Sequence, residues 1–210
     1  VEAFGGLLGD LVHDMEMEVR SGLAERLSES IDAPLNVVEM LANDELDVAR
    51  PILENSPVLD SEALVRIVRQ RSQEHKLVIA LRKEIDPATS EALAEEGNDS
   101  VVEALVRNKG AELSERALDV VVQKSEHNER LHQPLVSRQD LPPVMLQQMF
   151  WWVSNTLRER ILSITENIAP AELDKIFSDT GDAFSRNLEA EHDSSPAQKF
   201  VRRKAIMGQL

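Results

Sequence analysis

Apolar residues recur every three or four positions through most of this chain, which is the spacing of one face of an α-helix. Between residues 10 and 30 they recur every four positions and predict a single amphipathic helix. From residue 35 onward, short periodic segments alternate with turn residues. The pattern therefore predicts a succession of short helices and an all-α fold.

Four segments repeat nearly the same pattern. In each, an apolar residue is followed four or five positions later by a leucine and then by Asn or Arg, in residues 47–55, 75–82, 100–108 and 130–138. The leucines are spaced at 28, 24 and 30 residues: Leu53, Leu81, Leu105 and Leu135. Second amphipathic segments lie between them, at residues 61–71, 88–95 and 114–124. Because this spacing is typical of stacked helical repeats, we expect a HEAT-like α-solenoid of helix pairs.

Turn residues indicate where these helices begin and end. Asp60, Asp86 and Ser114 each carry a side-chain oxygen that can accept hydrogen bonds from the free N–H groups of a first helical turn. Gly97 and Gly110 lie just past predicted helix ends, where glycine is common. The helix pairs are therefore expected to be joined by short loops.

The pattern changes at Pro142 and Pro143, which can begin a helix but not continue one. A long apolar stripe follows and predicts one helix over residues 143–167. Trp151 and Trp152 are adjacent, so they point about 100° apart and cannot both lie at the centre of that stripe. We expect three parts: an acidic amphipathic helix in residues 1–33, the repeat array in 34–141, and capping helices in 142–210.

Composition supports the helical prediction. The chain has 42% hydrophobic residues but only 3% aromatic residues and no tyrosine, so aliphatic side chains must fill the core. The absence of cysteine excludes disulfides and thiol chemistry and fits a reducing compartment. No apolar run approaches the roughly 20 residues that a membrane span needs, and no signal peptide is evident. We expect a cytoplasmic protein that does not bind membranes.

Charge is distributed unevenly. The net charge of -15 disfavours nucleic acid as a partner, because phosphate contacts need a surplus of Lys and Arg. The first 60 residues hold 14 acidic side chains against three arginines. Residues 61–83, in contrast, carry six cations against two glutamates: Arg66, Arg69, Arg71, Lys76, Arg82 and Lys83. This local balance of +4 makes the segment the best candidate for a binding patch.

The ordered motifs also resemble those of a known family. They include Leu41-Ala42-Asn43-Asp44, Val48-Ala49-Arg50-Pro51-Ile52-Leu53, Ala80-Leu81-Arg82, Val101-Val102 with Leu105 and Asn108, and Pro134-Leu135 with Arg138, Asp140, Leu141 and Pro142. Over residues 35–168 the chain resembles uncharacterised bacterial proteins, frequent in alphaproteobacteria, with a domain of unknown function related to HEAT-like and leucine-rich-variant repeats. The resemblance implies a helical-repeat fold and implies no activity, cofactor or catalytic residue.

Polar residues that recur at helix ends have two interpretations. Asn55, Asn108, Arg82 and Arg138 can hydrogen-bond loop carbonyls of their own or a neighbouring unit. Alternatively, repeated guanidinium groups can line one face and bind a carboxylate or phosphate. On the second interpretation the partner-binding residues are Arg69, Arg82, Arg107 and Arg138. Replacing Arg82 with Ala should then weaken partner binding and leave the melting temperature nearly unchanged.

Signatures of catalysis and metal binding are missing from the sequence. It has no Gly-x-Gly-x-x-Gly, P-loop or Gly-x-Ser-x-Gly motif. His127 and His132 are five residues apart, which does not place them on one helical face. We therefore expect a non-enzymatic protein without cofactor or metal.

The function favoured by the sequence is that of an adaptor or regulatory module that binds another protein through a repeat surface. One alternative is a ligand-sensing module that binds a phosphorylated small molecule at the basic patch. Another is a self-assembling homodimer whose interface contains Trp151, Trp152, Met145 and Met149.

Overall fold

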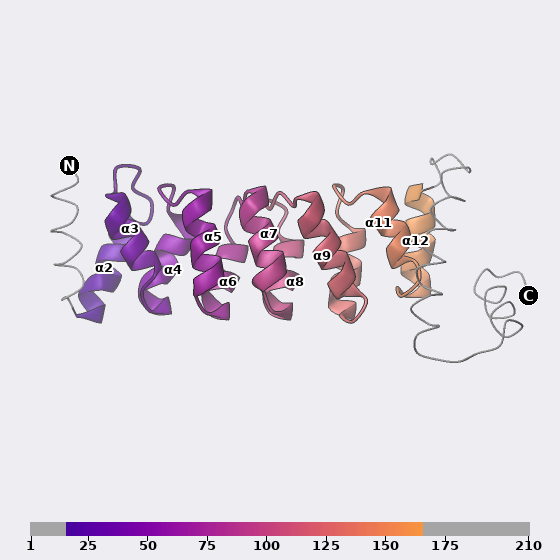
Figure 1. The fold of residues 1–210 in the computed structure, drawn as a ribbon, viewed down its shortest axis with the longest axis horizontal. Coiled ribbons are helices and arrows are strands. Elements are labelled where there is room, and N and C mark those ends of the chain that lie inside the picture. The colour runs from indigo at the N-terminus through magenta and orange to yellow at the C-terminus, as the bar shows by residue number, and fades with distance from the viewer. Residues whose placement is uncertain (1–15, 166–210) are drawn as a thin grey trace, which may run out of the picture.

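The structure, a computed structural model, describes residues 16–165, which fold into helices joined by short loops (Figure 1). The helices are α2 (Met17–Leu27), α3 (Leu35–Ala42), α4 (Leu46–Asn55), α5 (Ser61–Gln70), α6 (Gln73–Ala80), α7 (Pro87–Glu96), α8 (Asp99–Arg107), α9 (Glu115–Ser125), the 3₁₀ turn η1 (Glu129–Leu131), α10 (His132–Val136), α11 (Pro143–Met149) and α12 (Asn155–Thr165). No β-strand occurs between residues 16 and 165. The all-α prediction is confirmed for this part of the chain.

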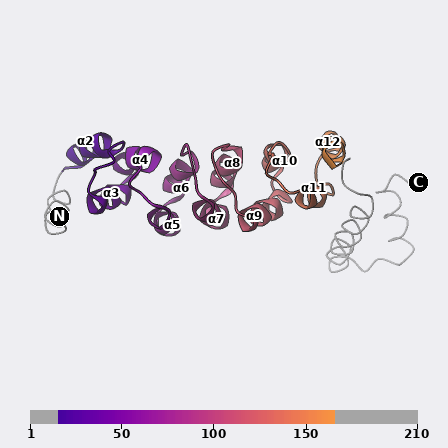
Figure 2. The same ribbon diagram turned by 90° about the horizontal axis from the view of Figure 1, so that it is seen from above.

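The helices form two layers, seen edge-on in Figure 2. The odd layer contains α3, α5, α7, α9 and α11, and the even layer contains α2, α4, α6, α8, α10 and α12. Within the odd layer α5 packs on α7 and α7 on α9; within the even layer α2, α4, α6 and α8 pack in succession. One continuous hydrophobic core lies between the layers.

Equivalent positions in the even layer are defined by burial. Ile52, Ile79, Leu105 and Leu135 are all fully buried, and each is followed by a second fully or almost fully buried residue. Leu81, in contrast, is 61% exposed, because it follows the end of α6. The four repeated segments are thus four consecutive even-layer helices. The leucine register predicted from the sequence is off by one residue at Leu53 and by two at Leu81, because Ile52 and Ile79 occupy the equivalent core positions.

Side-chain caps fix where several helices begin. Asp60 accepts a hydrogen bond from the Ala63 N–H at 2.8 Å, and Ser114 caps α9 through the Ala117 N–H at 3.0 Å. Asp86 accepts from two N–H groups in the first turn of α7. These contacts confirm the three helix starts predicted from the sequence, and a cap of this kind contributes about 1 kcal/mol.

The single helix predicted over residues 143–167 is wrong. Helix α11 ends at Met149 and α12 begins at Asn155, with a turn between them. Arg158 holds this turn by donating to the carbonyls of Phe150 at 2.9 Å and Trp151 at 3.2 Å. The break lets Trp152 turn back toward α9, where its indole N–H donates to Ser125 Oγ at 3.1 Å. The predicted capping helices beyond residue 165, and residues 1–15, lie outside the described residues.

The loops after α6 and α8 lie against each other. The Ile85 N–H donates to the Gly110 carbonyl at 3.1 Å, and the Glu112 N–H donates to the Ile85 carbonyl at 2.9 Å. At Gly110 the backbone passes so close to the neighbouring loop that a Cβ atom would overlap the Lys83 carbonyl oxygen. Glycine at this position is required by the close approach of two backbones.

We predict that Gly110→Ala destabilises the fold by more than about 2 kcal/mol, because the loop pair must move apart and lose its hydrogen bonds. Gly22→Ala is the matched control, since Gly22 lies inside α2 with nothing within 4 Å of its Cβ position. That variant should be stabilised by up to about 1 kcal/mol through helix propensity. Urea unfolding followed by circular dichroism measures both. Equal stability of the two variants would contradict the loop contact.

Candidate functional site

At one edge of the molecule, side chains that follow an even-layer helix reach back to the end of the preceding one. The Arg82 guanidinium donates to the carbonyl of Leu53 and, at 2.9 Å, to that of Ser56. One helix pair later, the Asn108 amide donates to the carbonyls of Ala80 at 2.9 Å and Arg82 at 2.7 Å. These bonds satisfy carbonyl groups that a helix end leaves without an internal partner.

Arg138 repeats this arrangement at the next helix pair. It donates to the carbonyls of Val106 at 3.1 Å, Asn108 at 3.0 Å and Ala111 at 2.9 Å. Its remaining hydrogen bonds go to the Asp140 carboxylate, at 2.8 and 2.6 Å, and they lower the pKa of Asp140 below its ordinary value. We call Arg82, Asn108 and Arg138 the carbonyl ladder.

The carbonyl ladder decides between the two interpretations of the recurring polar residues. Burial lowers the pKa of the Arg82 guanidinium, and the Arg138 side chain is only 10% exposed. Both guanidinium groups bind loop carbonyls of the preceding unit, as the first interpretation states. We therefore no longer assign Arg82 and Arg138 to a partner-binding surface. Asn55, at the equivalent place after Ile52, donates to the Pro51 carbonyl of its own helix at 3.2 Å.

Two lysines have the same role at the opposite edge, where odd-layer helices end. Lys124 donates to the carbonyls of Ala94 at 2.7 Å and Gly97 at 3.1 Å, and burial lowers its pKa. Lys76, which is buried, donates to the Glu96 carbonyl at 3.1 Å. The end of α7 is thus held by ammonium groups from the helix pairs on either side.

Asp44 joins three helix pairs at this edge. Its carboxylate accepts from Arg20 on α2 at 2.6 and 3.1 Å. Burial alone would raise the pKa of Asp44, but the hydrogen bonds from Arg20 and the Glu45 N–H lower it below its ordinary value. The Asp44 carbonyl accepts from Arg71 at 2.6 Å and from the His75 Nε2 position at 3.0 Å.

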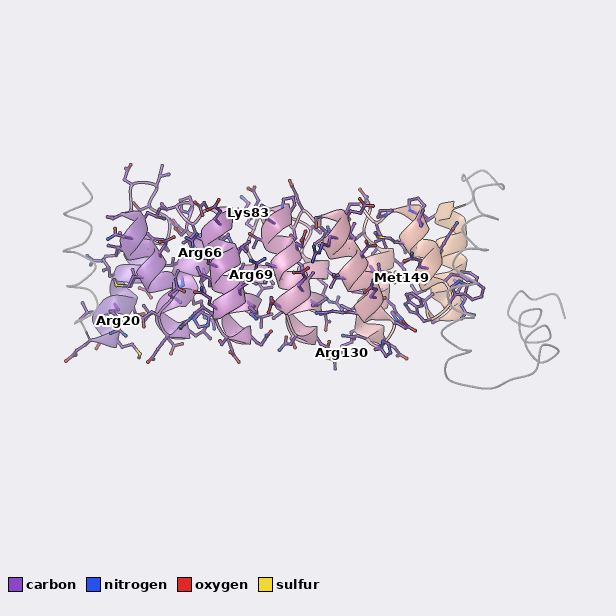
Figure 3. All side chains as sticks on the ribbon, in the orientation of Figure 1. Arg20, Arg66, Arg69, Lys83, Arg130 and Met149 are labelled. Carbon is purple, nitrogen blue, oxygen red and sulfur yellow. The ribbon has the colours of Figure 1, made fainter. Side chains whose placement is uncertain are left out.

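Only half of the cations in the basic patch predicted from the sequence therefore remain on the surface. Arg71, Lys76 and Arg82 point inward to carbonyl groups. The other three are exposed on α5 and on the loop that follows α6, as Figure 3 shows: Arg66, Arg69 and Lys83. We call these three residues the α5 patch.

Within residues 16–165, Arg69 and Lys83 have no hydrogen-bond or ion-pair partner. Arg66 does have one, because it pairs with Glu39 of α3 at 2.6 Å. They share this property with other exposed cations of residues 16–165, such as Arg26 and Arg130, but they differ from these in lying within one short basic segment of the sequence. They remain available to an acidic group from outside the chain.

Ion pairs across the odd layer leave a gap beside this patch. Glu39 and Arg66 join α3 to α5, while Arg116 joins α9 to α7 through Glu91 at 3.4 Å and Glu95 at 2.6 Å. In the part of the chain that the structure describes, no ion pair joins α5 to α7. Arg69 lies on α5 beside that gap.

Comparison with known proteins identifies the family. The family described as "Uncharacterised protein conserved in bacteria (DUF2336)" matches residues 48–210, well over half of the chain. The chain belongs to this family. The match extends to residue 210, beyond the region of resemblance found in the sequence, and it begins within α4. No curated protein and no solved structure matches the chain.

In this DUF2336 protein the four arginines predicted to bind a partner do not share one surface. Arg69 lies on the odd layer. Arg107 is exposed on α8 of the even layer and pairs with Glu103 one turn earlier at 3.1 Å. Arg82 and Arg138 belong to the carbonyl ladder. The sequence could not predict that these four arginines lie on different surfaces, because helix-end arginines look alike in sequence whether they point inward or outward.

The prediction that Met145 and Met149 lie in a dimer interface is wrong. Met145 and Met149 on α11 are 6% and 0% exposed and lie in the core (Figure 3 labels Met149). Both tryptophans are half-buried. Trp152 bonds Ser125 on α9, and Trp151 packs edge-to-face on Phe150 with ring centroids 6.0 Å apart. These contacts are internal and do not define a surface for a second copy.

The described residues show neither a metal site nor a membrane span. No group of three or more His, Asp or Glu side chains between residues 16 and 165 is arranged to hold a metal ion. His75 and His132 are buried, and each ring hydrogen-bonds a main-chain carbonyl. In the same range no helix combines the length and hydropathy needed to cross a membrane.

We predict that Arg82→Met destabilises the fold by about 2 kcal/mol or more, because the carbonyls at the end of α4 lose charged hydrogen bonds. Arg107→Met is the matched control and should cost less than about 1 kcal/mol, since it removes only an exposed ion pair. This reverses the sequence-based expectation that Arg82 can be replaced without loss of stability. Denaturant midpoints measured side by side test it, and similar midpoints for the two variants would contradict the ladder role.

Proposed function

We propose that this protein is a non-enzymatic adaptor that binds another protein through the α5 patch, displayed on a HEAT-like α-solenoid. The two-layered succession of helix pairs supports the repeat type. The observation that carries the binding role is that Arg66, Arg69 and Lys83, three cations of one short segment, are all exposed, and that Arg69 and Lys83 have no acid partner among residues 16–165.

The rest of the structure is suited to presenting this patch. Both edges of the stack are tied by hydrogen bonds between helix pairs, through Arg82 at one edge and Asp44 at the other. A surface that is fixed before binding loses less conformational freedom when a partner docks. Arg66 is held in position by Glu39 and completes the cationic surface.

The chemistry of the α5 patch favours an acidic segment of the partner. Guanidinium groups bind carboxylates through paired hydrogen bonds, and the Lys83 ammonium adds a third charge. Because these side chains are exposed, binding should weaken as salt is added. The net charge of -15 disfavours nucleic acid as the partner. We place the protein in the cytoplasm, in keeping with its lack of cysteine.

The test is affinity capture from a lysate of the source organism with two matched double variants. Arg69→Glu with Lys83→Glu reverses the patch, whereas Arg26→Glu with Arg130→Glu makes the same charge change at exposed cations elsewhere. We predict that the first variant captures at least about tenfold less of the partner than the wild type does, and that the control captures as much as the wild type. The melting temperatures of both variants should lie within a few degrees of that of the wild type.

Equal capture by both double variants would contradict the role of the α5 patch. If the wild type captures no protein, the alternative occupant of the same cations is a phosphorylated small molecule. Thermal unfolding with ATP or inorganic pyrophosphate distinguishes this case, because a ligand that binds only the folded state raises the melting temperature. The rise should disappear in the patch variant and persist in the control.

A further inference from the structure

Among the even-layer helices α4, α6 and α8, the outward residues beside the buried core position are apolar only at α6. Ile52, Ile79 and Leu105 are the buried core residues of α4, α6 and α8, and the residues two before and two after each of them point outward. At α6 these residues are Leu77, which is half-buried against the core, and Leu81, which directly follows the helix and is the most exposed leucine described.

The same two positions on the flanking helices carry opposite charges. On α4 they are Arg50 and Glu54, and on α8 they are Glu103 and Arg107. The order of charge is thus reversed between the two helices. We call these four residues, together with Leu77 and Leu81, the α6 face.

The three helices run in the same direction, because the carbonyl ladder joins the end of α4 to that of α6 and the end of α6 to that of α8. Across the layer, one row therefore reads Arg50, Leu77, Glu103 and the next reads Glu54, Leu81, Arg107. Positive and negative charges alternate at the four corners of a rectangle whose centre is apolar. The equivalent positions on α10 are uncharged, so the pattern does not continue beyond α8.

A rectangle of alternating charges is complementary to itself. When a second copy is turned over about a twofold axis in the plane of contact, each corner meets a corner of opposite charge. If the axis runs across the helices, Arg50 faces Glu54 of the other copy; if it runs along them, Arg50 faces Glu103. In both cases the leucines meet at the centre, as an isologous dimer requires.

We propose that the α6 face binds a second copy of this chain, forming a twofold-symmetric dimer through the even layer. Burying Leu81 and the rest of Leu77 removes apolar surface from water, and the alternating corners fix the orientation. A strongly acidic partner would meet two acids at the corners and the exposed Asp47 and Glu74 one turn away, so it fits this face less well than a second copy does.

The proposal is tested by sedimentation of the whole chain over a range of concentrations at low salt. The wild type should show a reversible monomer–dimer equilibrium. Leu81→Glu should raise the dimer dissociation constant at least about tenfold, because a charge replaces an apolar contact at the centre. Leu35→Glu, which changes an exposed leucine on α3 of the odd layer, is the matched control and should leave the equilibrium unchanged.

Charge exchange provides the sharper test. Arg50→Glu with Arg107→Glu makes all four corners acidic, and Glu54→Arg with Glu103→Arg makes all four basic. Each double variant alone should be monomeric, and an equimolar mixture should form a heterodimer. A wild type that stays monomeric, or a mixture that does not associate, would overturn the proposal and leave the face to a different protein.

Discussion

The structure depends on hydrogen bonds to the carbonyl groups at the ends of its short helices. A helix leaves its last four carbonyls without an internal partner, and α6 and α3 have only 8 residues each. In a stack of such helices the free carbonyls are a large fraction of the backbone, and many lie between packed helix pairs. Arg82, Asn108 and Arg138 satisfy them at one edge, and Lys76, Lys124 and Arg71 satisfy them at the other. Each bond also crosses from one helix pair to another, so the groups that complete the helices also hold the stack together.

This structural demand determines which cations remain for binding. The chain has 23 Lys and Arg residues against 38 acids, and several of its cations are committed to main-chain carbonyls. A basic segment in the sequence is therefore a poor guide to a basic surface. In residues 61–83 the helix-end cations Arg71 and Arg82 serve the scaffold, whereas Arg66 and Arg69, on the solvent side of α5, do not. What separates the two roles is the direction of the side chain, since Arg69 is in the last turn of α5 and yet is exposed, while Arg71, two residues later, binds the Asp44 carbonyl.

The sequence predicted the features that arise from local chemistry. The helix starts at Asp60, Asp86 and Ser114 follow from side-chain capping, which involves neighbours in sequence. The direction of the Arg82 and Arg138 side chains could not be predicted, because their acceptors lie 26 to 32 residues earlier in the chain. The break between α11 and α12 was missed for a related reason. The apolar stripe continues through it, and the turn is held by Arg158 and by the contact of Trp152 with α9.

The two proposed surfaces lie mainly on opposite layers, and they approach each other only at the loop after α6, where Lys83 is two residues from Leu81. The α5 patch lies on the odd layer and the loop beside it, and the α6 face lies on the even layer. Neither surface uses a residue of the other, and docking of a second copy on the even layer would leave Arg66 and Arg69 of the odd layer exposed. A twofold dimer would then present two α5 patches on its outer sides. A partner with two acidic segments could bind both, and the second contact would form at a high effective concentration. Self-association would in this way strengthen the adaptor function without adding any contact to the patch itself.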